Sequence, residues 1–310
     1  MRFVYCVDKN FNYQLATSIF SLLKNVNEEI DITILHEDSK SFLNIKSKLE
    51  KLPNIKNIEI FDVDIGNTSF PKIKNSHVSK ATYFRLFIPR YVNHKEHLVY
   101  LDADTIIIKN PLAILKKQIK QLDASDKFIS ACIETTKEAS GDIFERLDLQ
   151  SVNYFNAGVM IINGKLANRP DVTSEMINTM ESLDEKIKYW DQDVINKHFD
   201  LQIKTLDNRL NIKIDDNSPK LNYDLDPHIV HYAGSSKPWT LEGLLDTDSH
   251  FFQNSYLELL GKNIFFMTTN WKIGTLKLIL KEILTFSIFQ RKNYLKIIVS
   301  TFILLISRRA

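Results

Sequence analysis

Residues 99–108 read VYLDADTIII, an apolar run that contains Asp102 and Asp104. Side chains of an extended chain alternate between its two faces, so these aspartates point the same way. Two carboxylates at the end of a strand supply about half of the oxygen ligands that a divalent cation such as Mg²⁺ or Mn²⁺ prefers. The same pattern is also typical of an ordinary strand that ends in a polar loop, so the rest of the chain must decide between them.

The composition is typical of a globular protein, with 44% hydrophobic and 25% charged residues among 310. A chain of this length can bury a sizeable core. Cys6 and Cys132 both lie in apolar, strand-like runs, which favours a reducing compartment and no disulfide framework. The N-terminus reaches Asp8 too early for the apolar part of a secretory signal, so we expect a cytoplasmic protein.

Strand-like and helix-like segments alternate in the first part of the chain. The apolar spacing predicts them at 2–7, 13–24, 30–35, 42–52 and 58–63. Such alternation predicts an α/β fold, a Rossmann-like, mixed but mainly parallel sheet with right-handed crossovers and flanking helices. Ligands of these sheets bind at the carboxyl ends of the strands. This rule places four polar residues on one rim: Asp8, Asn10, Asp102 and Asp104.

The middle of the chain adds further elements. Residues 79–88 predict a helix that Ser79 caps. Arg85 interrupts its apolar side, and its charged end could simply reach water. Strands are predicted at 127–133, which ends at Glu134, and at 154–163. Gly158 in the second strand either lets a backbone or ligand approach closely or forms a bulge.

The last motifs lie between residues 189 and 239. Asp191 and Asp193 lie at the N-terminus of a predicted helix, where acidic side chains interact favourably with the helix dipole. Residues 207–228 show little periodicity and predict a loop. Residues 229–230 then predict a short strand that delivers His231, followed by a Gly-Ser-Ser loop and Lys237. A histidine, small-residue amides and a lysine at this spacing suit a metal-bridged diphosphate.

Six of these motifs, in this order, resemble family 8 glycosyltransferases, and most of all the bacterial lipopolysaccharide galactosyl- and glucosyltransferases. The resemblance covers about residues 1–240. The motifs are VYCVDKN (4–10), TYFRL (82–86), YLDAD (100–104), FNAGV (155–159), DQD (191–193) and HYAGSSKPW (231–239). The resemblance implies a GT-A fold, a UDP-sugar donor and retention of the anomeric configuration.

Roles for individual residues follow from the resemblance. It implies that Asp102, Asp104 and His231 ligate Mn²⁺ or Mg²⁺. The other implied contacts lie along the donor: Cys6, Val7, Asp8 and Asn10 at uracil and ribose, Ala103 between the metal carboxylates, Gly234 and Lys237 at the diphosphate, and Arg85, Asn156, Asp191 and Gln192 around the sugar.

The resemblance further implies that Gln192 and Asp191 lie nearest the reacting carbon. Two positions depart from the family pattern. Ala103 replaces a bulkier residue, and Glu134 stands where some relatives have an aspartate. Both positions affect how a sugar fits, so galactose and glucose remain open as the transferred hexose.

The C-terminal part differs from the rest in charge. Residues 262–310 carry nine basic residues and one acid, a net charge of +8, which leaves −6 for residues 1–261. We therefore divide the chain into a catalytic domain, 1–245, and a helical region, 246–310. A basic tail on an acidic body indicates an anionic partner.

Residues 263–310 combine these basic residues with aromatic and aliphatic ones. The last apolar run, 297–306, precedes Arg308 and Arg309 and is shorter than the roughly 20 residues that span a bilayer. The pattern favours an in-plane anchor on the inner, anionic face of the cytoplasmic membrane. A lipid-linked saccharide acceptor would suit that place. A helical subdomain packed on the body is the alternative, and the aromatic spacing does not favour nucleic acid.

Three other functions share part of the pattern. A haloacid-dehalogenase-type phosphatase would use Asp102 as nucleophile and Asp104 as acid, but that motif ordinarily follows the first strand. A sugar-nucleotide pyrophosphorylase would need a Gly-rich basic N-terminal loop, which DKNF at 8–11 is not. A non-enzymatic nucleotide-sugar-binding module would leave the order of the six motifs unexplained.

Overall fold

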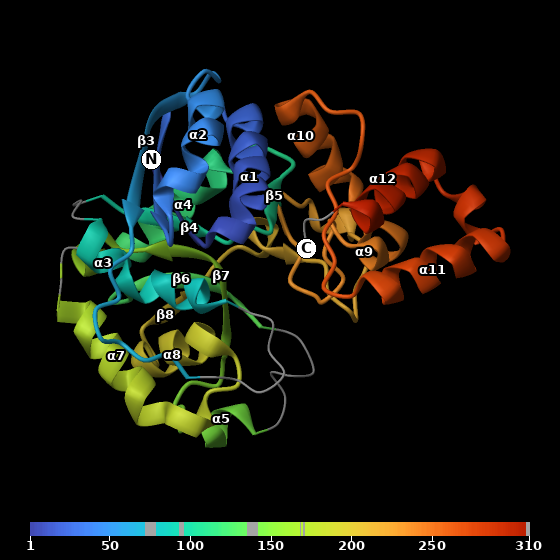
Figure 1. The fold of residues 1–310 in the computed structure, drawn as a ribbon. Helices are drawn as coiled ribbons and strands as arrows, with labels where there is room; N and C mark the ends of the chain where they lie inside the picture. The colour runs from blue at the N-terminus through green and yellow to red at the C-terminus, as the bar shows by residue number, and fades with distance from the viewer. Residues whose placement is uncertain (72–78, 93–95, 135–141, 168, 170, 308–310) are drawn as a thin grey trace.

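The computed structural model describes residues 1–71, 79–92, 96–134, 142–167, 169 and 171–307 (Figure 1). Arg308 and Arg309, which the sequence places after the last apolar run, lie outside the described residues.

The main sheet is mixed and mainly parallel, as predicted. Within the described residues it has seven strands in the order β3-β2-β1-β4-β7-β6-β8. β7 runs antiparallel to its neighbours β4 and β6, and the other pairs are parallel. The strands are β1 (Arg2–Val7), β2 (Ile30–His36), β3 (Ile55–Asp62), β4 (Leu98–Leu101), β6 (Ile129–Ile133), β7 (Phe155–Ile162) and β8 (Ile203–Thr205).

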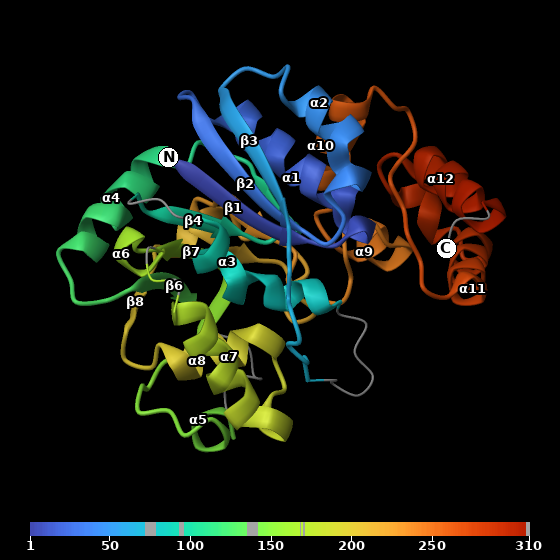
Figure 2. The same cartoon turned by 60° about the vertical axis from the view of Figure 1, so that its left-hand side comes forward.

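Helices cover both faces of this sheet (Figures 1 and 2). One face packs against α1 (Asn12–Asn25), α2 (Leu43–Leu49) and α4 (Leu112–Asp123). The other packs against α3 (Ile88–Tyr91), α5 (Ile143–Arg146), α6 (Gly164–Ala167), α7 (Asp171–Leu183) and α8 (Trp190–His198). β1 shows why: Phe3 and Tyr5 enter the first core and Val4 the second, as the two-residue period of a strand requires.

A second, smaller sheet brings the distant end of the chain to the aspartates. Within the described residues it consists of β5 (Thr105–Ile107), β10 (Ile229–His231) and β9 (Ile212–Lys213). β10 pairs antiparallel with β5, with His231 opposite Thr105. This register places the imidazole beside Asp104, the residue before β5.

Two predicted elements need correction. Residues 207–228 are not all loop: they contain β9 and 3₁₀ turns at Asn208–Leu210 and Tyr223–Leu225. A two-residue strand is too short to show a period in the sequence. Residues 79–88 form a 3₁₀ helix at Lys80–Phe87 that leads into α3, and the Ser79 hydroxyl accepts from the Ala81 amide as predicted.

The C-terminal helices divide between two places (Figure 1). α10 (His250–Leu260) contributes Phe252 and Tyr256 to a core beside the smaller sheet. α9 (Leu241–Asp246), α11 (Lys272–Leu284) and α12 (Tyr294–Ile306) form a lobe at the side of the molecule. Its small core consists of Leu241, Leu244, Leu245, Phe265, Met267, Ile279, Ile288 and Ile297.

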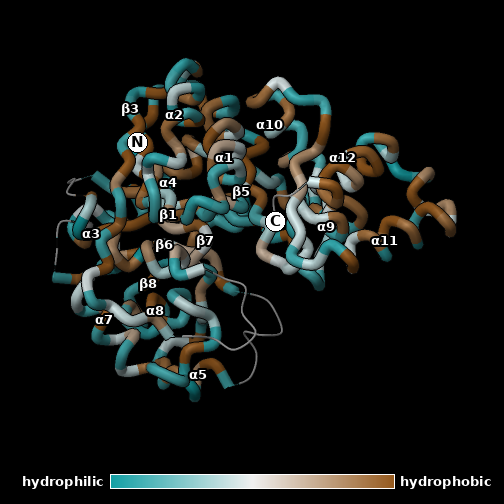
Figure 3. The backbone as a smooth tube through the Cα atoms, viewed as in Figure 1, coloured by the Kyte–Doolittle hydropathy of each residue, from teal (hydrophilic) through white to brown (hydrophobic). Residues whose placement is uncertain are grey.

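The alternative considered for the tail, a helical subdomain packed on the body, is thus present, and its core includes residues that precede position 246. The division at 245/246 stays a prediction. Figure 3 shows hydrophobic residues along both α11 and α12. Among the described residues, no helix combines the length and the hydropathy that crossing a bilayer requires.

A group does approach Gly158 closely, but it is the ring of His231 and not a backbone or a ligand. The predicted irregularity is present too, because the β6–β7 register shifts between the Ala131–Met160 and Ile133–Phe155 pairs. A Cβ atom at position 158 would lie 2.2 Å from Cε1 of that ring. β7 therefore needs a glycine at this point so that β10 can present its imidazole to the aspartates.

We predict that Gly158→Ala lowers the free energy of unfolding by about 1–3 kcal/mol, the usual cost of overpacking, because the ring must move. Denaturant unfolding measures this cost. The same substitution made in a His231→Ala variant, which lacks the ring, should cost much less free energy of unfolding relative to His231→Ala alone. An equal cost in both backgrounds would contradict the steric explanation.

Candidate active site

Asp102, Asp104 and His231 converge as the sequence predicted. Asp102 follows β4, Asp104 precedes β5 and His231 ends β10. One ligand atom from each lies within 4.8 Å of the others. Nε2 of His231 is 3.3 Å from Oδ1 of Asp104 and 3.8 Å from Oδ2 of Asp102. This geometry can hold a divalent cation.

The remaining carboxylate oxygens of this cluster bind protein groups. Oδ1 of Asp102 accepts from Arg85 at 3.0 Å and from the Tyr100 hydroxyl. Oδ2 of Asp104 accepts from Nζ of Lys237 at 2.8 Å. In the described part of the chain, Oδ1 of Asp104 is buried without a hydrogen-bond partner. Because a buried, unpaired oxygen is costly, this atom fits a metal ligand.

The two aspartates differ in their acidity. Burial raises the pKa of Asp102, and Arg85 only partly offsets this. Burial also acts to raise the pKa of Asp104, but Lys237 and His231 outweigh it and hold the pKa below its usual range. Asp104 is therefore the more strongly anionic side of the cluster.

Arg85 is buried and does not extend into water. It donates to the Ala157 carbonyl at 2.6 Å and forms ion pairs with Asp102 and Asp191. Burial acts to lower the pKa of Arg85, but these two carboxylates raise it above its usual value. The residue stays charged and links the metal cluster to α8.

The residues predicted around the sugar lie together beside Arg85. Thr82 donates to Oδ1 of Asp191 at 2.8 Å, and burial raises the pKa of Asp191 to about 6. The amide oxygen of Gln192 accepts from the Ala157 amide at 3.0 Å and from Asn156 at 3.3 Å. Backbone and side-chain donors thus fix the Gln192 amide.

Glu134 marks the far edge of this group. Its carboxylate accepts from Nδ2 of Asn156 at 3.0 Å and forms an ion pair with Lys213. Sequence reasoning missed Lys213 and its neighbour Asn211, because both lie in the segment that was predicted as loop.

The residues predicted at the nucleotide lie at the end of β1. Asp8 is buried and accepts from the Asn10 amide at 2.8 Å, which caps a 3₁₀ turn at Lys9–Phe11. Burial raises the pKa of the Cys6 thiol well above its usual value, while the nearby Arg85 acts to lower it and Asp102 to raise it. The neighbouring Val7 and Ala103 are buried.

The backbone amides of the Gly234–Lys237 loop were predicted to meet the diphosphate, but two of them already donate to protein groups. The Ser235 amide donates to Oδ1 of Asp216 at 3.0 Å, and the Gly234 amide donates to the Ile214 carbonyl. Lys237 is the group of this loop that lies at the metal cluster. A Cβ at position 234 would meet Cα of Asp215 at 2.8 Å, so this turn needs a glycine.

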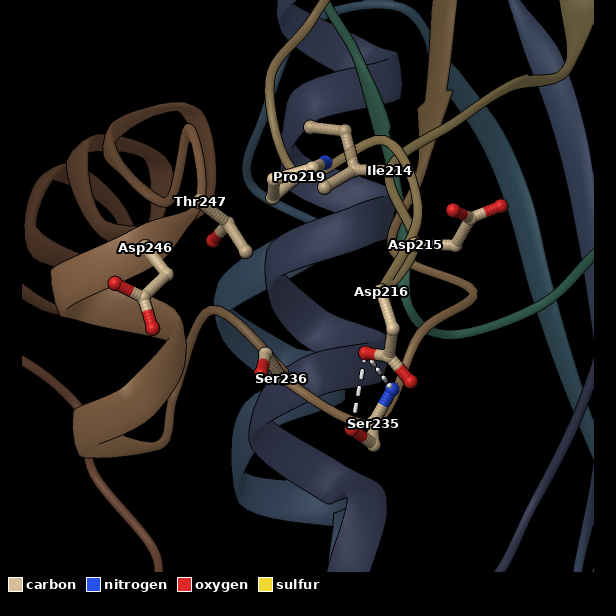
Figure 4. A pocket seen from close by; sticks show the side chains of 8 residues that line it. All are labelled: Ile214, Asp215, Asp216, Pro219, Ser235, Ser236, Asp246 and Thr247. Atoms are coloured by element: carbon tan, nitrogen blue, oxygen red, sulfur yellow. Dashed lines mark hydrogen bonds between the residues drawn. The ribbon is translucent and has the colours of Figure 1, made fainter.

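Ser235 and Ser236 of this loop line a cavity of about 460 Å³ (Figure 4). None of the three metal-cluster residues lines it. Its wall is formed by Ile214, Asp215, Asp216, Pro219, Ser235, Ser236, Asp246 and Thr247. Three carboxylates in the wall disfavour binding of a diphosphate in this cavity.

The comparisons with known proteins agree with this geometry. The model of the family "Glycosyl transferase family 8" matches residues 2–243. General stress protein A of Bacillus subtilis is 27% identical over 261 residues, 77% of this chain and 87% of that protein. The lipopolysaccharide 1,2-glucosyltransferase of Escherichia coli is 28% identical over 252 residues, 75% of this chain and 71% of that protein.

The solved structures agree on the fold. The galactosyltransferase LgtC in complex with donor and acceptor sugar analogues superposes with a TM-score of 0.70 at 21% identity, over 83% of this chain and 96% of that one. This likeness confirms the GT-A architecture. The chain belongs to glycosyltransferase family 8, an enzyme family whose members transfer hexoses with retention of configuration.

Proposed function

We propose that this enzyme transfers galactose or glucose from a UDP-sugar to a saccharide acceptor, with a divalent cation, Mn²⁺ or Mg²⁺, at Asp102, Asp104 and His231. The convergence of one oxygen from each aspartate with Nε2 of His231 carries this proposal. Relatives named as a lipopolysaccharide glucosyltransferase and a galactosyltransferase support a hexose and a lipopolysaccharide-type acceptor. Family membership disfavours the phosphatase, pyrophosphorylase and binding-module alternatives.

Transfer breaks the bond between the anomeric carbon and the diphosphate, and negative charge develops on UDP. A bound divalent cation supplies Lewis-acid stabilisation of that charge. Lys237 contributes a second positive charge, because its ammonium lies 2.8 Å from Asp104 at the same place. In this proposal Gly234 shapes the turn around the diphosphate, and Cys6, Val7, Asp8, Asn10 and Ala103 contact the nucleoside.

Asp191 and Gln192 act at the sugar, together with Arg85 and Asn156. The Asp191 carboxylate stabilises positive charge on the anomeric carbon. The Gln192 oxygen already accepts two N–H groups, so it is poorly placed to attack that carbon. We therefore favour attack by the acceptor hydroxyl on the face that UDP leaves. A bond forms between the anomeric carbon and the acceptor oxygen while the bond between that carbon and the phosphate oxygen breaks. The departing phosphate takes the proton of the hydroxyl.

The C-terminal lobe is the proposed attachment to an anionic membrane surface, where a lipid-linked acceptor would lie. Its inner residues form the small core, but its outer apolar side chains face solvent. Leu284 is 77% exposed, Phe286 70% and Ile306 81%. Lys277 and Lys281 lie on α11 with Leu284, and Lys296 lies on α12 with Ile306. Exposed apolar residues among basic ones are typical of an interfacial membrane-binding face.

We predict that Asp104→Ala lowers transferase turnover by at least about 100-fold, because loss of a neighbour of a metal ligand alone costs about 10–100-fold. Hydrolysis of UDP-galactose and UDP-glucose with Mn²⁺ measures turnover, and thermal unfolding checks the fold. Asp126→Ala, at an exposed aspartate, is the control. Activity of the Asp104 variant without metal would contradict the mechanism.

A second prediction concerns pH. The pKa of Asp191 is about 6, so its carboxylate is neutralised as the pH falls through that value, and it no longer stabilises positive charge on the sugar. At saturating Mn²⁺ and donor, turnover should therefore fall below about pH 6. Asp191→Asn should be slower and should lose this limb. The same decline of turnover at low pH in the unaltered protein and in Asp191→Asn would assign that decline to another group.

A third prediction tests the lobe in the full-length chain. The double variant Leu284→Glu, Phe286→Glu should reduce binding to vesicles of phosphatidylglycerol and phosphatidylethanolamine by at least about tenfold, since each buried apolar side chain contributes about 1.5–3 kcal/mol. Sedimentation measures binding. Val152→Glu changes a side chain that is 87% exposed outside the lobe and should have no effect. Equal losses in both variants would exclude a specific face.

A further inference from the structure

A chain of buried side chains connects His231 to Glu134. Nδ1 of His231 lies 3.0 Å from Oδ1 of Asn211. Nδ2 of Asn211 donates to Oδ1 of Asn156 at 3.0 Å, and Nδ2 of Asn156 donates to Glu134. His231 is 4% exposed, Asn211 5% and Asn156 7%. The mechanism above assigns no role to Asn211.

The direction of every hydrogen bond in this chain is fixed by a backbone amide. The Gly158 N–H donates at 3.0 Å to the side chain of Asn156. Because a backbone N–H can only donate, the Asn156 atom that it meets must be oxygen. Asn211 must then donate to that oxygen through its NH₂ group. Its own oxygen is left to face His231.

Glu134 fixes the same direction independently. An ionised carboxylate can only accept, so the NH₂ group of Asn156 must point at it. Lys213 forms an ion pair with Glu134, and the two side chains are only 11% and 10% exposed. β9 pairs in register with β10, with Lys213 beside His231. The lysine that anchors the far end of the chain is thus held by the strand that carries the imidazole.

The amide oxygen of Asn211 faces Nδ1 of His231, so Nδ1 must carry a proton. Nε2 is the ring nitrogen that faces the two aspartates. We propose that Asn211 is a positioning residue, which holds the proton on Nδ1 of His231 and so reserves the Nε2 lone pair for the metal. This inference rests on the proposed metal-dependent function.

Asn156 extends the same network to the sugar end of the site. Its NH₂ group also approaches the Gln192 oxygen at 3.3 Å. The orientation of the metal-binding imidazole and the orientation of the Gln192 amide therefore depend on one asparagine, and Asn211 carries only the branch toward the metal. A change at Asn211 should act on metal binding before it acts on the sugar.

The test compares Asn211→Leu and Asn211→Asp with the unaltered protein. Leucine removes both the acceptor for Nδ1–H and the NH₂ group that donates to Asn156. Aspartate removes only the donor and keeps the acceptor, so the difference between the two variants isolates the acceptor. Asn12→Leu is a matched control, because Oδ1 of Asn12 lies 2.7 Å from Nε2 of His36 in a similar buried pair. NMR of ¹⁵N-histidine protein detects the Nδ1–H proton of His231, assigned with His231→Gln, and electron paramagnetic resonance follows titration with Mn²⁺ alone.

We expect a protected Nδ1–H proton in the unaltered protein and in Asn211→Asp, and its loss in Asn211→Leu. Mn²⁺ affinity should fall about 10–100-fold in Asn211→Leu, the usual effect of removing such a neighbour, and stay near normal in Asn211→Asp and Asn12→Leu. Unchanged affinity in Asn211→Leu, or an equal loss in Asn12→Leu, would overturn the positioning role. Failure of the unaltered protein to bind Mn²⁺ would overturn the proposed function as well.

Discussion

The site depends on how the oxygens of Asp102 and Asp104 are shared. One oxygen of each carboxylate is held by a protein cation, Arg85 or Lys237, and the other faces His231. The cations thus orient the carboxylates as well as balance them. Two like charges about 4 Å apart repel by about 4 kcal/mol at an effective dielectric constant near 20. Arg85 and Lys237 offset this repulsion from both sides.

The two sheets explain why His231, the third residue beside Asp102 and Asp104, comes from so far along the chain. The main sheet delivers Asp102 at the end of β4, and the turn to β5 places Asp104 on the boundary between the sheets. Pairing of β10 with β5 then fixes His231 opposite Thr105. Gly158 of β7 leaves room for the ring. A shift of one residue in the β5–β10 register would turn the imidazole to the other face.

The sequence predicts much of this arrangement, because strand ends and local motifs carry strong signals. The alternation of strands and helices and the delivery of His231 by a short strand are visible in residues 2–63 and 229–231. Asp102 and Asp104 do converge, but the reason predicted for it was wrong: a turn in which the Thr105 amide donates to the Asp102 carbonyl brings them together, not the alternation of an extended strand. The burial of Arg85 could not be predicted, since it depends on Asp191, which comes from another helix. The roles of Asn211 and Lys213 could not be predicted, because β9 has only two residues and its pairing with β10 is a tertiary contact without a local sequence pattern.

The lobe obeys a different constraint. Its small core needs Leu241, Leu244 and Leu245 from the segment before it, so the lobe is held to the catalytic part by apolar packing. Burying one side of α11 and α12 on so small a core leaves the opposite sides facing solvent. Exposed side chains such as Leu284, Phe286 and Ile306 cost solubility unless another surface covers them. The same two helices carry Lys277, Lys281 and Lys296, so the lobe combines positive charge with exposed apolar side chains.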